Sequence, residues 1–489
     1  MNENYNNNND NKYEKNLQAK LGLFTTVSIV VGAVIGSGIF KKPALMASQL
    51  GSPELLILVW VLAGVITLFG ALSNAEVASM ISATGGQYVF FEKMYGKFFS
   101  FLYGWSIFAV IQTGSIASIT YIFGEYSQFF EPLRIYNFIP PEYVDFSLTI
   151  PLLGQIFPFH DIGIKIVTIS TILLLTAVNY IGVMFGGIVA NIFTWMKILA
   201  ILLLVYFGFT YTGGNIMNFT TDATSTTFGS VGSLAGFVAA LSGAFWAYDG
   251  WNNITYIAGE VKNSQRNIPL ALTIGALIIL GIYLLINLAY IYVMPVDVMS
   301  NSTLVAADVA LKSIGPIGAG LVAAAVMIST FGTSNGTIMV SARVYFAMSR
   351  NNHFFTTIGK VHPRFSTPAN ALTLQAVWTC VLVISGTFDT LTDMLIFVSW
   401  IFYAAGAYGL FILRKKMPDA DRPYKVWGYP YVPAIFVIFA TLFVGLTLYA
   451  DITNYISGKS LIINSLFGLF LVAIGIPLYY YFQSREKTD

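Results

Sequence analysis

The segment VVGAVIGSGIFKKPA, residues 30–44, lies inside the first long apolar run of the chain. Three glycines, Gly32, Gly36 and Gly38, fall within seven positions of this segment, and two lysines and a proline follow directly. Glycine weakens a helix and proline kinks or ends one. The segment therefore predicts a membrane-spanning helix that is broken near its centre.

The composition places the whole chain in a membrane. Of 489 residues, 56% are hydrophobic and 10% are charged, and the mean hydropathy is +0.71, whereas soluble domains carry roughly 25% charged residues. The length of the apolar runs and their weak two-residue periodicity argue against a β-barrel. We expect an all-α polytopic membrane protein with twelve transmembrane helices, at about 22–46, 54–81, 98–127, 163–184, 188–212, 231–260, 267–293, 308–349, 369–388, 391–413, 431–450 and 461–482.

Several classes of protein are excluded by the residue inventory. A net charge of +2 gives no reason to expect nucleic acid as a partner. The single cysteine, Cys380, rules out an intramolecular disulfide, and the three histidines lie far apart in sequence. We find no metal-ligand spacing, nucleophile motif or phosphate-binding loop, and we expect no metal, no cofactor and no enzymatic activity.

The distribution of lysine and arginine predicts the orientation. If the N-terminus is inside and twelve helices follow, 18 of the 25 Lys and Arg residues fall on the inner side and six on the outer side. Cytoplasmic loops carry the excess of positive charge, so both termini are expected in the cytoplasm. Residues 1–20 are asparagine-rich and predict a disordered cytoplasmic tail.

A second interruption lies in the sixth apolar run, SGAFWAYDGWNNITYIAGE, residues 242–260, where Gly243, Asp249 and Gly250 fall mid-span. Transmembrane glycines often serve helix packing alone. Two interruptions at corresponding positions, however, indicate an inverted-repeat transporter with its site near the midplane. The predicted units are the tail 1–20, a first repeat 21–212 (helices 1–5, with an external loop 128–162), a second repeat 213–413 (helices 6–10), and 414–489 with helices 11 and 12 and a short cytoplasmic C-terminus.

Broken helices expose backbone groups that need partners, because lipid offers none. Near Ser37, Gly38 and Ile39 the second half-helix begins, and its free N–H groups and positive dipole end suit a carboxylate. Carbonyl groups near Val34 and between Trp246 and Asp249 suit an ammonium group. A carboxylate and an ammonium held side by side describe an α-amino acid.

These residues also carry a family resemblance. VGAVIGSGIF and FWAYDGW…GEVKNSQRNIPLA resemble the first and sixth spans of the amino acid–polyamine–organocation superfamily. The similarity continues, in family order, in TGGQYVFFEKMYG (84–96), NIFTWMKILA (191–200), STFGTSNGTIMVSARVYFAMSRN (329–351) and LRKKMPDADRPYKVWGYPYVP (413–433). The pattern is most similar to the L-type amino acid transporters and the bacterial serine/threonine exchangers.

The resemblance implies roles for particular residues. Ser37 and Gly38 would bind the substrate carboxylate, and carbonyls of Val34, Trp246 and Asp249 would receive the amine. Trp246 lies where such transporters have an aromatic gate that closes over substrate from outside. The alternative for Trp246 is an ordinary packing or lipid-facing tryptophan.

Lys197 lies about ten residues into the fifth span, or ~15 Å along a helix, so it is near mid-membrane. Intramembrane charges are expensive and usually functional. The resemblance implies that this lysine replaces the Na⁺ that bridges spans 1 and 8 in sodium-coupled relatives. It would contact carbonyls near Gly32 and hydroxyl groups of the eighth span, with Ser329, Thr330 and Thr333 as candidates. Two alternatives stay open: proton coupling through the amine, and a lysine that snorkels to the interface.

Substrate selectivity is expected to depend on spans 3, 6, 8 and 10. The candidate pocket residues are Gln112, Thr113, Ile116, Ser399 and Tyr403. Asp249 is the one acid near them, and it departs from many relatives. It could attract the amine, be protonated, or cap the broken helix. Because no other acid lies near the candidate pocket residues, a neutral substrate is favoured over a dibasic one.

The sequence therefore predicts a secondary active transporter that works by alternating access and exchanges neutral L-amino acids without sodium. The alternatives are a proton-coupled amino acid symporter and, from another class, an amino-acid-sensing membrane receptor. The expected location is the plasma membrane or bacterial inner membrane. The external loop holds no cysteine, so no disulfide-linked heavy chain is expected. The Lys41–Lys42 pair lies on the outward half of the first span, against the charge bias, and stays unexplained.

Overall fold

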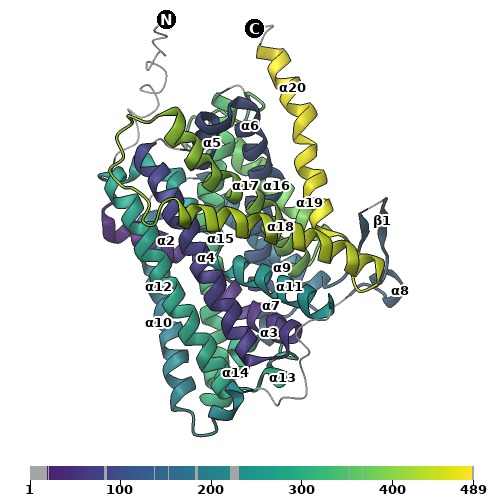
Figure 1. The fold of residues 1–489 in the computed structure, drawn as a ribbon. Coiled ribbons are helices and arrows are strands. Elements are labelled where there is room, and N and C mark those ends of the chain that lie inside the picture. The colour runs from purple at the N-terminus through teal and green to yellow at the C-terminus, as the bar shows by residue number, and fades with distance from the viewer. Residues whose placement is uncertain are drawn as a thin grey trace, which may run out of the picture.

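The computed structural model describes residues 19, 21–81, 85–136, 138–151, 153–181, 186–220, 231–351, 353–365 and 367–486. The predicted tail, residues 1–20, lies almost wholly outside these residues. Helices make up most of the described chain (Figure 1). The helices are α2 (Leu23–Val34), α3 (Gly38–Leu50), α4 (Pro53–Met80), α5 (Gln87–Tyr95), α6 (Lys97–Ser106), the π-helix η1 (Ile107–Ile111), α7 (Gln112–Ser127), α9 (Ile162–Ile181), α10 (Gly186–Thr210), α11 (Val231–Tyr248), the 3₁₀ helix η4 (Trp251–Glu260), α12 (Ser264–Val293), α13 (Val296–Met299), α14 (Val305–Ser313), α15 (Pro316–Arg350), α16 (Ala369–Ser385), α17 (Phe388–Lys416), α18 (Tyr431–Ile456), α19 (Asn464–Ala473) and α20 (Gly475–Glu486).

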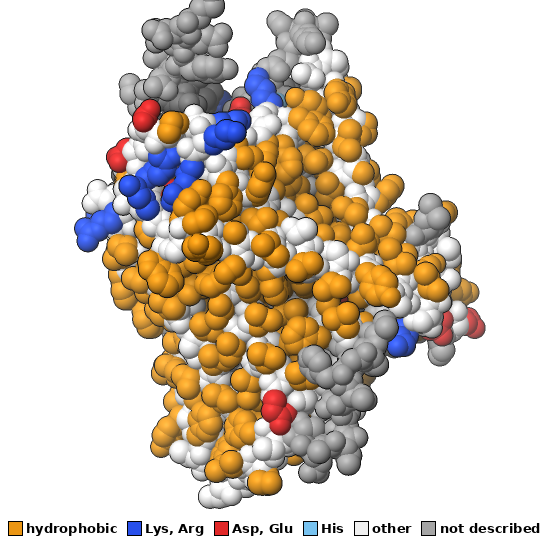
Figure 2. Space-filling model, viewed as in Figure 1, with side chains coloured by type: hydrophobic (Ala, Val, Ile, Leu, Met, Phe, Trp, Pro, Cys, Tyr) orange, Lys and Arg blue, Asp and Glu red, His pale blue; other side chains and the backbone are white. Residues whose placement is uncertain are grey.

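Ten helical segments of the described residues are long and apolar enough to cross a membrane, counting α2 with α3, α6 with α7, and α19 with α20 as one each. The predicted all-α polytopic membrane class is confirmed at this level. The shorter α16 has 17 residues, and α11 ends at the break before η4. The count of twelve spans stays a prediction. Figure 2 shows hydrophobic side chains over most of the visible face, with Lys and Arg gathered toward one end.

Both predicted interruptions are breaks in helical structure. The first helix ends at Val34, Ile35 has a non-helical ψ of 86°, and α3 begins at Gly38. The sixth run ends its α-helix at Tyr248, and Gly250 follows with φ 94°, in the left-handed region that glycine adopts at little cost. The predicted run 308–349 is also divided, because Gly315 with φ 96° and the proline after it separate α14 from α15.

The loop 128–162 contains short elements: the 3₁₀ turn η2 (Glu131–Leu133), the helix α8 (Pro141–Val144), and an antiparallel hairpin of β1 (Leu148–Ile150) and β2 (Gly154–Ile156). Another short turn, η3 (Ile216–Phe219), follows α10. Gln155 N donates to Leu461 O at 2.8 Å, and Ile463 N donates to Leu153 O at 2.9 Å. The hairpin is therefore tied to the connection between α18 and α19.

The two breaks lie against each other because glycines allow close approach. A Cβ atom at Gly38 would lie 2.5 Å from Ala247 Cα, so α3 and α11 touch through backbone. A Cβ atom at Gly250 would lie 3.2 Å from Ala33 O, at the end of the other half-helix. Glycine thus brings the interrupted parts of the first and sixth spans into one place.

Candidate functional site

A cavity of about 330 Å³ of atom-free space, counting its open side, lies where the two breaks meet. Its lining residues come from the first, third, sixth and eighth spans: Ala33, Val34, Gly36, Ser37, Gly38, Ser115, Ile119, Trp246, Asp249, Gly250, Asn253 and Thr337. Five predicted substrate residues are among them: Val34, Ser37, Gly38, Trp246 and Asp249.

The first break offers hydrogen-bond donors to this cavity. The N–H groups of Gly36, Ser37 and Gly38 donate no backbone hydrogen bond within the described part of the chain. Ser37 is 1% exposed, and its Oγ has no hydrogen-bond partner among the described residues. A buried polar group without a partner is unusual in a folded protein and asks for an explanation. An anionic ligand at this helix N-terminus would supply the missing acceptor.

The sixth-span break adds Trp246 and Asp249. The Trp246 ring packs edge-on against Phe388 with centroids 6.1 Å apart, and its Nε1 has no hydrogen-bond partner among the described residues. Asp249 N donates to Trp246 O at 3.2 Å, so that carbonyl is already engaged. Tyr403 donates its hydroxyl to Asp249 Oδ1 at 2.7 Å. The acid at the break therefore has a partner from α17.

Tyr283 on α12 is a site residue that the sequence analysis missed. Its hydroxyl lies 3.0 Å from Val34 O and 2.9 Å from Ala247 O, and so reaches the carbonyl ends of both broken helices. Val34 O keeps a second lone pair for another donor. A tyrosine inside an apolar run gives no signal of such a contact, because its partners are known only once the helices are packed.

Lys197 is buried on α10 and reaches the end of the first half-helix. Its Nζ donates to Gly32 O at 2.6 Å, to Ile35 O at 2.7 Å and to Thr333 Oγ1 at 3.0 Å. These contacts join the first, fifth and eighth spans, and a cation is favourable at the carbonyl end of a helix. The lysine does not snorkel to an interface.

The other eighth-span hydroxyl groups do not contact the amine. Thr330 donates to Val326 O at 2.9 Å, within its own helix. Ser329 is 1% exposed, and its Oγ has no hydrogen-bond partner among the described residues. Of the three candidates, Thr333 is thus the residue that the structure brings to Lys197.

The predicted selectivity residues do not line the cavity. Gln112 lies one contact away, where its Nε2 donates to Asn253 Oδ1 at 3.2 Å. The other four are buried: Thr113, Ile116, Ser399 and Tyr403. Of these, Tyr403 reaches the cavity through its contact with Asp249. Ser115 and Ile119 line it from α7 instead. Gln112, Thr113 and Ile116 share the regular helix α7 with these two residues, so the packing of α7, which follows the π-helical turn η1, decides which of them face the cavity.

Ile39, also expected at the substrate, is fully buried and is not in the cavity wall. Its carbonyl accepts a 3.5 Å hydrogen bond from the Tyr290 hydroxyl. Within the described residues, no group of three or more His, Cys, Asp and Glu side chains is placed to hold a metal.

Comparisons with known proteins agree on one class. A family model described as amino acid permease matches residues 21–475. The chain is 29% identical to the serine/threonine exchanger SteT of Bacillus subtilis (strain 168), over 97% of this chain and 99% of that protein. It is 30% identical to the b(0,+)-type amino acid transporter 1 of Homo sapiens (84% and 79% covered) and to the cystine/glutamate transporter of Homo sapiens (96% and 86% covered).

Proposed function

Because the chain belongs to the amino acid permease family, we propose that it exchanges neutral L-amino acids across a membrane by alternating access, without sodium. The observation that carries this proposal is the unpartnered hydroxyl of Ser37 beside the free N–H groups of Gly36 and Gly38. These groups face the cavity at the meeting point of two broken helices. The relatives are named as transporters and exchangers, which favours transport over a receptor or an enzyme.

The substrate carboxylate would lie at the first break. Ser37 and Gly38 would donate to it from the start of α3, where the helix dipole favours negative charge. The ammonium group would lie toward Val34 O and the carbonyl end of α11, beside Asp249. Trp246 would be the lid on one side of this site.

The wall beyond these backbone groups supports a small neutral side chain. Ser115, Asn253 and Thr337 present hydroxyl and amide groups, and Ile119 adds an apolar contact. The acid in the wall, Asp249, already accepts from Tyr403. A second cationic group on the substrate would therefore compete with an existing hydrogen bond.

The contacts of Lys197 support sodium independence. Its ammonium group fills the position between the carbonyls of α2 and Thr333 on α15, so a positive charge is already present there. A sodium ion beside it would meet strong repulsion. A proton-coupled symporter stays the alternative, because an amine can carry a proton.

We further propose the complete architecture of the family. It has twelve transmembrane helices in two inverted repeats, 21–212 and 213–413, followed by two appended helices in 414–489. Both termini would face the cytoplasm, in the plasma or bacterial inner membrane. The gathering of Lys and Arg at one end of the molecule supports this orientation (Figure 2). The single cysteine, Cys380, lies in α16 rather than in the loop 128–162, which favours a transporter without a disulfide-linked heavy chain.

Ser37→Ala in proteoliposomes tests the binding site. Because Ser37 Oγ has no partner in the described part of the chain, its loss should leave thermal stability unchanged. It should weaken apparent substrate affinity about twofold to tenfold, the value of one hydrogen bond of about 0.5–1.5 kcal/mol. Ser118→Ala is the matched control, since Ser118 is equally buried and unpartnered among the described residues but does not line the cavity. Unchanged affinity in Ser37→Ala would contradict the assigned site.

Uptake measurements separate the transport modes. A competition panel of the twenty amino acids against labelled substrate identifies the side chain accepted. Uptake that requires amino acid inside the liposomes indicates exchange, whereas uptake driven by a pH gradient alone indicates proton symport. A sodium requirement would refute the proposed independence.

A further inference from the structure

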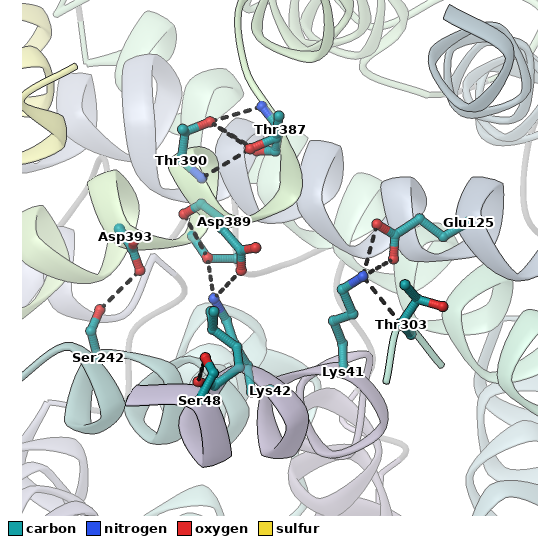
Figure 3. A network of polar contacts seen from close by, with 12 residues as sticks. Lys41, Lys42, Ser48, Glu125, Ser242, Thr303, Thr387, Asp389, Thr390 and Asp393 are labelled. Atoms are coloured by element: carbon teal, nitrogen blue, oxygen red, sulfur yellow. Dashed lines mark hydrogen bonds and ion pairs between the residues drawn. The ribbon is translucent and has the colours of Figure 1, made fainter. Parts of the chain in front are cut away.

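Two adjacent lysines, which the substrate site does not use, tie α3 to two different helices (Figure 3). Lys42 Nζ lies 2.7 Å from Asp389 Oδ1 and 2.9 Å from Thr392 Oγ1, both on α17. Lys41 Nζ lies 2.8 Å from Glu125 Oε2 at the end of α7. It also lies 3.4 Å from Thr303 O, in the segment before α14.

Lys42 is placed at a high energetic cost. Its side chain is 0% exposed, whereas that of Asp389 is 42% exposed. Taking a charged group out of water is expensive, and a well-packed hydrophobic residue is often at least as stable. A buried ion pair is therefore weak evidence for stability alone, and a role in specifying one arrangement of the helices is better attested. The exposed carboxylate gives this pair a route to solvent.

The pair is connected to the cavity through one aromatic ring. Lys42 Nζ lies 4.8 Å above the centroid of the Phe388 ring, within the range of a cation–π contact. The same ring packs edge-on against Trp246, with centroids 6.1 Å apart. Trp246 lines the cavity. Lys42 therefore contacts the Phe388 ring, and that ring packs against Trp246, the proposed lid.

The start of α17 is capped by its own side chains and contacts both broken spans. Thr387 and Thr390 form a capping box that fixes its first turn. One turn beyond Asp389, the carboxylate of Asp393 accepts a 3.3 Å hydrogen bond from Ser242 on α11 (Figure 3). Thus α17 holds α3 through one acid and α11 through the next, on the same side of the cavity as Trp246.

We propose that Lys42 and Asp389 are positioning residues that latch α3 and the Trp246 lid against α17, and that the cavity opens on this side when the pair breaks. The Lys41–Glu125 pair is a second tie of the same half-helix. This inference rests on the proposed function for its direction: the latched side is the outer side of the membrane. It explains why two lysines follow the break on that side, against the charge bias.

The test measures access to the cavity rather than transport. The full chain carries Cys380→Ser and a reporter, Ser115→Cys, in the cavity wall, and intact cells are labelled with a membrane-impermeant maleimide. Lys42→Met and Asp389→Asn should each raise the labelling rate at least fivefold. Asp389→Glu should restore the slow rate, because it keeps the charge at a site with room. Lys312→Met, which removes an exposed lysine of α14, should change nothing.

The outcomes decide separately on the latch and on the function. Parental labelling rates in folded Lys42→Met and Asp389→Asn protein would overturn the latch. If Lys42→Met fails to fold, Asp389→Asn decides, because it changes one charge at a partly exposed site. Protection of the reporter by amino acids tests the proposed function in the parent alone. Faster labelling of the variants without such protection would keep the latch and refute amino acid binding.

Discussion

Replacing Lys197 by methionine should weaken substrate binding strongly. The ammonium group donates to Gly32 O at 2.6 Å and to Ile35 O at 2.7 Å. Thr333 also donates to Ser329 O at 2.9 Å, so the threonine keeps a partner without the lysine. The two carbonyls would be the groups left without a donor, directly beside the cavity.

The size of the effect follows from these two contacts. Hydrogen bonds to a charged group contribute about 1.5–3 kcal/mol each, so the pair is worth about 3–6 kcal/mol. Desolvation of the buried ammonium offsets several kcal/mol of this, and the methionine does not carry that cost. We take a net loss of about 2 kcal/mol for the ordered end of α2. If the substrate binds only when that end is ordered, the apparent affinity falls roughly 30-fold.

The assay is exchange of labelled amino acid in proteoliposomes, with folded protein quantified for each variant. Lys165→Met is the matched control. Lys165 is also buried, and it donates to three carbonyls, of Phe157, Pro158 and Ile384, at 3.0–3.2 Å, away from the cavity. An affinity for Lys197→Met within twofold of the parent would refute the reasoning. So would an equal loss in Lys165→Met, because the effect would then belong to any buried lysine.

Three further changes test the packing around the site. Gly38→Ala should destabilise the protein by about 1–3 kcal/mol, seen as a lower melting temperature, because its Cβ would lie 2.5 Å from the backbone of α11; Gly36→Ala, whose nearest contact would be 3.7 Å, should melt normally. Glu76→Gln should lower the free energy of unfolding by about 3 kcal/mol, because it removes a fully buried carboxylate that accepts hydrogen bonds from Arg414 at 2.7 and 2.9 Å. Proteolysis of the 417–430 loop should then be faster. Tyr283→Phe should lower the free energy of unfolding by about 1–3 kcal/mol, because the Tyr283 hydroxyl lies within hydrogen-bond distance of two buried carbonyls. An unchanged melting temperature would contradict this.

The two breaks could be predicted because their causes are local. Glycines at 36, 38 and 250 weaken the helix at their own positions, so the sequence alone locates the interruptions. The role of Gly38 could not be predicted in the same way. Its missing side chain makes room for the backbone of α11. A contact between helices is visible only after they pack.

Contacts between residues distant in sequence could not be predicted either. Lys41 and Lys42 are separated from their acids by 84 and 347 positions, and no local pattern links such residues. Nor could the sequence show that Ser115 and Ile119 line the cavity, because the packing of α7 against other helices decides which of its residues face it. Long-range pairing and helix packing thus account for most of the site residues that the sequence analysis missed or misplaced.

The two buried lysines hold the same broken helix on either side of its break, and their different partners imply different functions. Lys197 neutralises the carbonyl end of α2, whose geometry bounds the substrate cavity whichever side is open. Lys42 joins α3 to the first turn of α17, a contact that exists only while that side is closed. Loss of the first should therefore weaken binding from both sides of the membrane, whereas loss of the second should change the side from which the cavity is reached. A common effect on folding would produce neither pattern.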